Sequence, residues 1–128
     1  IVQSLDFKKI KNDKYIIMKN SGINHTEIKP EKWGKTALEC GAGEILLNSI
    51  DNDGGLLGYD YKFIENISKK LECPILALGG AGNWEHIYQL FATSNVSAAC
   101  TQNIYHFTQE SINSAKKYLI NKDIKIRV

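Results

Sequence analysis

The chain has 128 residues, of which 43% are hydrophobic and 23% charged, and its 16 basic and 14 acidic side chains give a formal charge of +2. This length and apolar content suit one domain with its own core, whereas so small a charge excludes the electrostatic footprint of a nucleic-acid or membrane-surface protein. The sequence shows neither an apolar run near the ~20 residues of a membrane span nor a signal-peptide pattern. We therefore expect no nucleic-acid or membrane partner, and three widely spaced cysteines in apolar settings favour a cytoplasmic protein.

The N-terminal third predicts a strand, a hairpin and a helix. An apolar run over residues 1–6 and a second β-type run over residues 14–18 are separated by the Asn-Asp turn signal at 12–13. This arrangement predicts a hairpin. A polar loop then leads into a helix over residues 30–41, with proline in its first turn and glycine at its end.

The rest of the chain alternates strands and helices. Further apolar runs predict strands at residues 44–48, 74–78 and 97–101. Each is followed by an amphipathic segment, and Asp60, Asn83 and Thr108 are the residues expected to cap these helices. Ile112 is expected to face inward from the last helix.

Apolar strands that alternate with amphipathic helices predict an α/β fold with a parallel sheet. Four such units in 128 residues average about 32 residues each, close to the ~31 of a closed eight-unit barrel. The spacing therefore fits either a small open sheet or the (β/α)4 half of a TIM (β/α)8 barrel, with a β-hairpin inserted after the first strand.

In either architecture, ligands bind at the C-terminal ends of the parallel strands. Asp6 ends the first predicted strand, and Asp51 and Asp53 follow the second. A positioned carboxylate can transfer protons. A structural role is the other interpretation. Asp51 and Asp53 are typical turn residues beside two glycines, and Asp6 is as well suited to a hydrogen-bonding role at a strand end as to catalysis.

Residues 79–82 (GGAG) lie between a strand and a helix. Glycines allow a close backbone approach, and free N–H groups at a helix start attract an anion, so the motif indicates a phosphate site completed by residues 101–103. A tight strand-to-helix turn is the other interpretation. If the motif is a phosphate site, substitution of Gly80 by valine is expected to weaken phosphate binding while the fold largely survives.

No metal site is predicted. His25, His86 and His106 lack the spacing of metal ligands and are expected to be structural. The three cysteines lie at a helix end, before a proline and within a strand, which favours neither a disulfide framework nor a Cys–His nucleophile.

Several of these segments together resemble the cyclase subunit of imidazole glycerol phosphate synthase. They are residues 41–54 (GAGEILLNSIDNDG), 58–60 (GYD), 79–82 (GGAG) and 105–107 (YHF). The resemblance covers essentially the whole chain and implies a (β/α)8 barrel made of two similar halves. Only the C-terminal half is matched, and the chain starts with Ile, so residues 1–128 are expected to be a single half-barrel domain and a fragment of a full barrel.

The resemblance also implies a reaction and its residues. Ammonia from a glutaminase subunit would convert a phosphoribulosyl formimino carboxamide ribonucleotide to imidazole glycerol phosphate in histidine biosynthesis, without metal or cofactor. Asp6 matches the second catalytic aspartate, the first being absent here, and Glu44 matches a charged residue at the ammonia entrance. Residues matching substrate and phosphate contacts are Asp53, Gly54, Gly79, Gly80, Gln102 and Asn103.

The chain departs from the family pattern near this expected pocket. The family has Thr at positions 48 and 55, Ser at 78, and Ala-Ser at 102–103, and three of these changes remove a hydroxyl. An alternative is therefore a paralogue that supports ammonia-dependent amidation of a surface sugar, and another is a non-catalytic half-barrel module.

A half-barrel would leave two strand edges open, at residues 1–6 and 97–101. It would also expose apolar side chains that should face the barrel centre, among them Leu5, Leu46 and Ile75. Pairing with the missing N-terminal half or with a second copy is expected.

Overall fold

The computed structural model describes residues 1–107 and 111–127. Its strands are β1 (Val2–Ile10), β2 (Lys14–Lys19), β3 (Asn24–His25), β4 (Glu44–Ser49), β5 (Ile75–Leu78) and β6 (Ala98–Cys100). Its helices are α1 (Pro30–Glu39), α2 (Tyr61–Ser68), α3 (Trp84–Thr93), α4 (Ile104–Phe107) and α5 (Ile112–Ile120), with a 3-10 turn at Lys11–Asp13.

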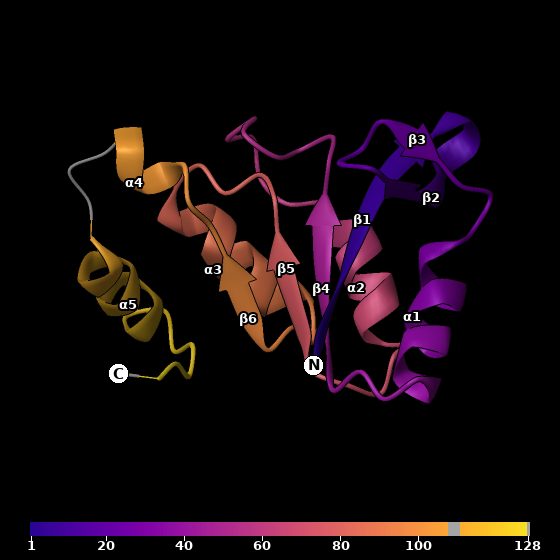
Figure 1. Ribbon diagram of the computed structural model, residues 1–128. Coiled ribbons are helices and arrows are strands. Elements are labelled where there is room, and N and C mark those ends of the chain that lie inside the picture. The colour runs from indigo at the N-terminus through magenta and orange to yellow at the C-terminus, as the bar shows by residue number, and fades with distance from the viewer. Residues whose placement is uncertain (108–110, 128) are drawn as a thin grey trace.

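The strands form one 6-stranded sheet in the order β3-β2-β1-β4-β5-β6. β1, β4, β5 and β6 are parallel neighbours in chain order, whereas β2 and β3 form an antiparallel extension on the far side of β1. Figure 1 shows the helices beside and behind these parallel strands. The α/β prediction is confirmed, because this is a (β/α)4 half of a TIM barrel with a hairpin after its first strand.

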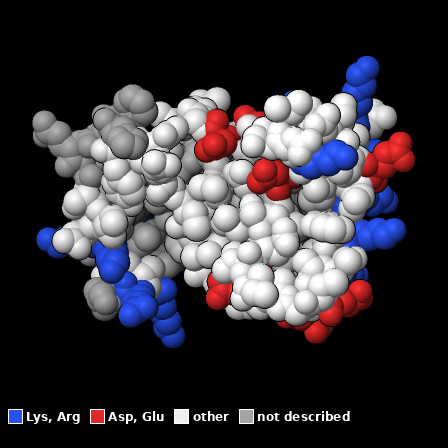
Figure 2. Space-filling model, viewed as in Figure 1, with Lys and Arg blue, Asp and Glu red and all other residues white. Residues whose placement is uncertain are grey.

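The two faces of the parallel strands differ in burial. Alternate residues lie under the helices and are at most 1% exposed: Leu5, Phe7, Ile45, Leu47, Ile75 and Ala77. The intervening side chains are half-buried or exposed, and no helix of the described residues covers their face (Figure 1). We call this the open face; Figure 2 shows that its centre is mostly uncharged, with acidic groups scattered over it and basic groups at its margins.

The prediction that Leu5 and Ile75 face the barrel centre is therefore wrong. Both are 0% exposed and pack in the core on the helix side. Leu46 does lie on the opposite face from its buried neighbours Ile45 and Leu47, because side chains alternate along a strand.

The predicted caps at the starts of α2 and α3 are confirmed. The side chains of Asp60 and Asn83 cap α2 and α3 by accepting from the backbone N–H of residues 63 and 86. α5 is capped by Ser111, and the predicted cap Thr108 lies outside the described residues. Ile112 is 59% exposed, so the prediction that it faces inward is wrong.

β1 is longer than predicted because it pairs with two strands. Val2 to Phe7 pair with β4, and Phe7 to Ile10 pair with β2 across the hairpin. The edge of β1 away from β4 therefore remains unpaired over residues 2–6 among the described residues, as does the outer edge of β6.

Asp60 links the hairpin to the helical layer. Its Oδ1 accepts from the Phe63 N–H at 3.3 Å, and its Oδ2 accepts from the Tyr15 hydroxyl at 2.8 Å. The Tyr15 ring stacks on Phe63 with centroids 4.1 Å apart. Burial, followed by this hydrogen bond, raises the pKa of Tyr15, so the phenol remains a donor to Asp60 at neutral pH.

We expect Asp60→Ala to lower the free energy of unfolding by about 2 kcal/mol, because it removes a helix cap and a hydrogen bond worth about 1 kcal/mol each. Tyr15→Phe should cost about 1 kcal/mol by losing the hydrogen bond alone. Urea denaturation measures both. The double variant should be no less stable than Asp60→Ala; full additivity of the two losses would contradict the link.

Candidate functional site

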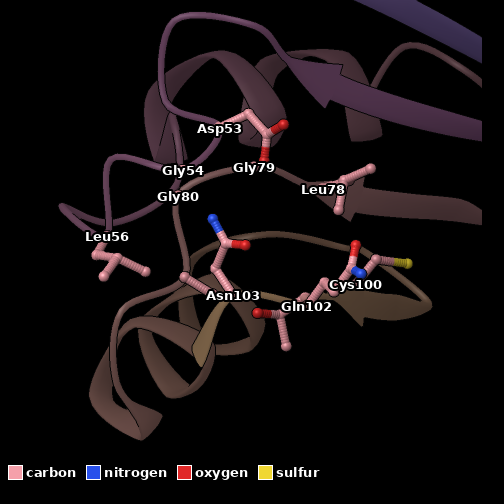
Figure 3. A pocket seen from close by; sticks show the side chains of 11 residues that line it. Asp53, Gly54, Leu56, Leu78, Gly79, Gly80, Cys100, Gln102 and Asn103 are labelled. Atoms are coloured by element: carbon pink, nitrogen blue, oxygen red, sulfur yellow. The ribbon is translucent and has the colours of Figure 1, made fainter. Parts of the chain in front are cut away.

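A cavity of about 140 Å³ opens where the loops after β4, β5 and β6 meet (Figure 3). Its lining comprises Asp53, Gly54, Leu56, Leu78, Gly79, Gly80, Ala81, Cys100, Thr101, Gln102 and Asn103. All the residues predicted from the resemblance to contact substrate and phosphate are thus gathered around one space, although they come from separate parts of the chain. Their roles there remain predictions.

The glycines after β5 permit a close contact between two loops. The N–H of Gly58 donates to the carbonyl oxygen of Gly80 at 2.8 Å. Gly80 has a φ of +109°, and a Cβ added to it would lie 2.1 Å from the Gly58 oxygen. A Cβ at Gly82 would lie equally close, 2.1 Å, to the Leu56 oxygen.

These contacts correct one expectation. Valine at Gly80 would displace backbone atoms of the β4–α2 loop, so the prediction that the fold survives this substitution is wrong. Close packing of the two loops therefore accounts for Gly80 and Gly82 by itself, so the presence of these glycines does not indicate a phosphate site.

The hydrogen-bond donors around the glycine segment divide into two sets. At the start of α3, Gly82 donates to Nδ1 of His86 at 3.1 Å, and the His86 N–H donates to Asn83 Oδ1 at 2.9 Å. The backbone N–H groups of residues 79–81 have no acceptor among the described residues. The residues that carry these N–H groups all line the cavity.

Among the residues that the structure describes, the cavity lining contains carboxamides but no lysine, arginine or histidine. Figure 3 shows the Asn103 side chain reaching between the loops toward Gly80, and Gly54 leaves room for it, since a Cβ there would lie 3.4 Å from Asn103 Nδ2. An anion or hydroxyl-bearing group would thus be held by neutral N–H donors, with the Asp53 carboxylate at the rim.

Tyr59 joins the walls of the cavity and was not predicted as a site residue. Its buried hydroxyl donates to the Cys100 carbonyl at 3.0 Å, while Asn52 Nδ2 donates to the Gly58 carbonyl at 3.0 Å. Burial raises the pKa of Tyr59. The only sequence signal was the GYD motif at 58–60, which did not show that Tyr59 reaches β6.

Asp6 lies on the open face, outside the cavity lining. Register pairs it with Asn48, and Asn48 with Leu78, which does line the cavity. With neighbouring strands ~4.8 Å apart, Asp6 is about 10 Å from Leu78 across the sheet. Its Oδ1 accepts from Asn48 Nδ2 at 3.0 Å and from Ser4 Oγ at 3.4 Å.

The other predicted carboxylates have different surroundings. Asp51 accepts from the Lys9 N–H at 2.8 Å and lies 3.8 Å from the Lys8 ammonium, so it fastens the β4–α2 loop to β1. Glu44 begins β4, at the opposite end of the sheet from the cavity.

The remaining titratable candidates whose side chains are described form no second cluster. His86 holds the loop before α3, His25 is exposed on β3, and the side chain of His106 lies outside those described. All three cysteines are free, and burial raises the pKa of Cys73 and Cys100. Within 1–107 and 111–127, no cluster of metal-ligating side chains occurs and no helix is long and apolar enough to cross a membrane.

Comparison with known proteins extends over the whole chain. Residues 1–111 match the family model described as histidine biosynthesis protein. All 128 residues align with proteins named imidazole glycerol phosphate synthase subunit HisF, at 41% identity in Chlorobium phaeobacteroides, 43% in Prosthecochloris aestuarii and 37% in Bacillus cereus. The chain spans 51% of the length of each of these relatives.

If the cavity binds phosphate, Asn103→Asp should weaken binding of glycerol phosphate at least about tenfold. The substitution keeps the side-chain shape but places a negative charge beside the anion, and tenfold corresponds to only ~1.4 kcal/mol. Calorimetric titration measures the change. The matched control is Asn95→Asp, at an exposed position before β6, and equal affinities in the two variants would exclude the phosphate site.

Proposed function

This chain belongs to the histidine biosynthesis protein family, and we propose that it forms the C-terminal half of the cyclase subunit of an imidazole glycerol phosphate synthase. The observation that carries the proposal is its similarity, over 100% of its length, to relatives with that name, of which it spans 51%. The half-barrel architecture supports it, since a chain of this fold needs a second half to close.

In the proposed reaction, the intact barrel acts as a carbon–nitrogen lyase and cyclase. Ammonia enters a phosphoribulosyl formimino carboxamide ribonucleotide, which is cleaved and cyclised to imidazole glycerol phosphate and an aminoimidazole carboxamide ribonucleotide. Asp6 serves as a general acid/base. Two observations support this role. Asp6 lies on the open face, and Asn48 and Ser4 both donate to its Oδ1, whereas no donor to its Oδ2 occurs among the described residues.

The cavity would hold one of the two phosphates of this substrate. The backbone N–H groups of residues 79–81 and the amides of Gln102 and Asn103 would donate to it, with Asp53 and Gly54 lining the adjoining cleft. The second phosphate would lie in the N-terminal half. An extended substrate is what a cavity about 10 Å from Asp6 requires.

A glutaminase subunit would supply the ammonia from the other end of the barrel. Glu44 supports this placement, because it begins β4 at the end of the sheet away from the cavity. We further propose a cytoplasmic enzyme that needs neither metal nor organic cofactor.

The single half-barrel domain, residues 1–128, would pair with an N-terminal half or with a second copy of itself. The unpaired edges of β1 and β6 and the open face support this pairing. Because the first catalytic aspartate is expected in the N-terminal half, the chain alone would have no cyclase activity.

A second candidate is ammonia-dependent amidation of a surface sugar by a paralogue. Its support is the lining of the cavity by Leu78 and Asn103, where the family pattern has hydroxyl side chains. Turnover of the histidine-pathway substrate by the intact barrel would favour the first candidate. Binding of a nucleotide-linked sugar without that turnover would favour the second, and neither activity would indicate a non-catalytic half-barrel.

In the intact barrel, Asp6→Asn should lower turnover with ammonium salt 10²–10⁴-fold, because it keeps the shape of the side chain but removes proton transfer. Absorbance assays of product formation measure the loss. Asp51→Asn is the matched control and should keep near-normal turnover, since its side-chain oxygen can still accept from Lys9. Normal turnover by Asp6→Asn would contradict the assignment.

A further inference from the structure

Asn48, on β4, donates a hydrogen bond to Asp6 on the neighbouring strand β1, and both residues lie on the open face. Parallel pairing places Asp6, Asn48, Leu78 and Cys100 in register across β1, β4, β5 and β6. Leu78 and Cys100 line the cavity, and Asn48 donates from Nδ2 to Asp6 Oδ1 at 3.0 Å. Asn48 therefore lies between the proposed acid/base and the proposed phosphate cavity.

The orientation of the Asn48 amide follows from its partner. Nδ2 donates to Asp6, and Oδ1 lies on the other side of the same planar amide group, so Oδ1 faces elsewhere. That Oδ1 is buried, and it has no hydrogen-bond donor among the described residues. Buried acceptors are nearly always satisfied in folded proteins, so this atom indicates a donor supplied from outside these residues.

The hydrogen bonds to Asp6 are also one-sided. Asn48 and Ser4 both donate to Oδ1, which leaves Oδ2 without a protein donor among the described residues. The amide thus fixes which carboxylate oxygen is available. A group bound at Asn48 Oδ1 would lie within one side chain's width of Asp6.

We propose that Asn48 is a positioning and specificity residue. Its Nδ2 holds Asp6 so that Oδ2 exchanges the proton, and its Oδ1 accepts a hydrogen bond from an N–H or O–H group of the substrate next to the reacting atom. This rests on the proposed function of Asp6. Asn48 thereby selects substrates with an amine, amide or hydroxyl donor next to its Oδ1, and disfavours substrates that place an acceptor or an apolar group there.

The test compares two substitutions in the intact barrel with ammonium as the nitrogen source. Asn48→Leu has a similar shape but neither donates nor accepts, so kcat should fall and KM should rise, each about tenfold for one lost hydrogen bond. Asn48→Thr keeps a hydroxyl that donates and accepts, and should recover most of both losses. Asn66→Leu, at an exposed position on α2, is the matched control and should leave both constants unchanged.

Thermal unfolding of each variant separates misfolding from the proposed effect, and Asn48→Ala replaces the leucine variant if that protein does not fold. Wild-type kcat and KM in Asn48→Leu would overturn the proposal. A lower kcat with unchanged KM would overturn the substrate contact, because the donor to Oδ1 would then come from the protein. If Asp6→Asn keeps full activity, the proposed function fails instead, whatever the Asn48 variants do.

Discussion

The alternation of side chains across the parallel strands is the constraint from which the rest of the structure follows. One set of residues, including Leu5, Leu47 and Ile75, is fully buried under the helices. The other set, including Asp6, Asn48 and Leu78, faces away from the helices and forms a row in register. The core therefore lies on the helix side of the sheet, and the polar side chains of the candidate site lie on the opposite face. A second half-barrel would cover that opposite face.

The cavity depends on a second constraint, which is the direct backbone contact between two loops. The β4–α2 loop and the β5–α3 loop meet so closely that only glycine fits at positions 80 and 82. Tyr59 then fastens the same loop to the end of β6 through the Cys100 carbonyl. The loops after three strands are thus held together around the cavity, which residues 79–81 and Asn103 line.

Features governed by neighbouring residues were predictable from the sequence, and features governed by register were not. Asp60 and Asn83 cap helices within three residues of themselves, so their roles could be predicted. Residues 74–78 form an unbroken apolar run, which predicts a strand but not which of its side chains face the helices, so the face taken by Ile75 was predicted wrongly. The Asn48–Asp6 contact joins residues 42 positions apart and appears only once β1 and β4 are paired. The family resemblance predicted that Asp53, Gly79 and Asn103 contact substrate or phosphate. Their spacing in the sequence predicted only that they lie at the same edge of a sheet.

The half-barrel fold leaves the open face for a second half to cover. Sedimentation equilibrium of the purified 14.4 kDa chain at micromolar concentration, with and without the N-terminal half, tests whether such pairing occurs. We expect a species of at least twice the chain mass when the chain is alone, and a one-to-one complex when that half is added. A well-folded monomer that does not bind the N-terminal half would contradict it.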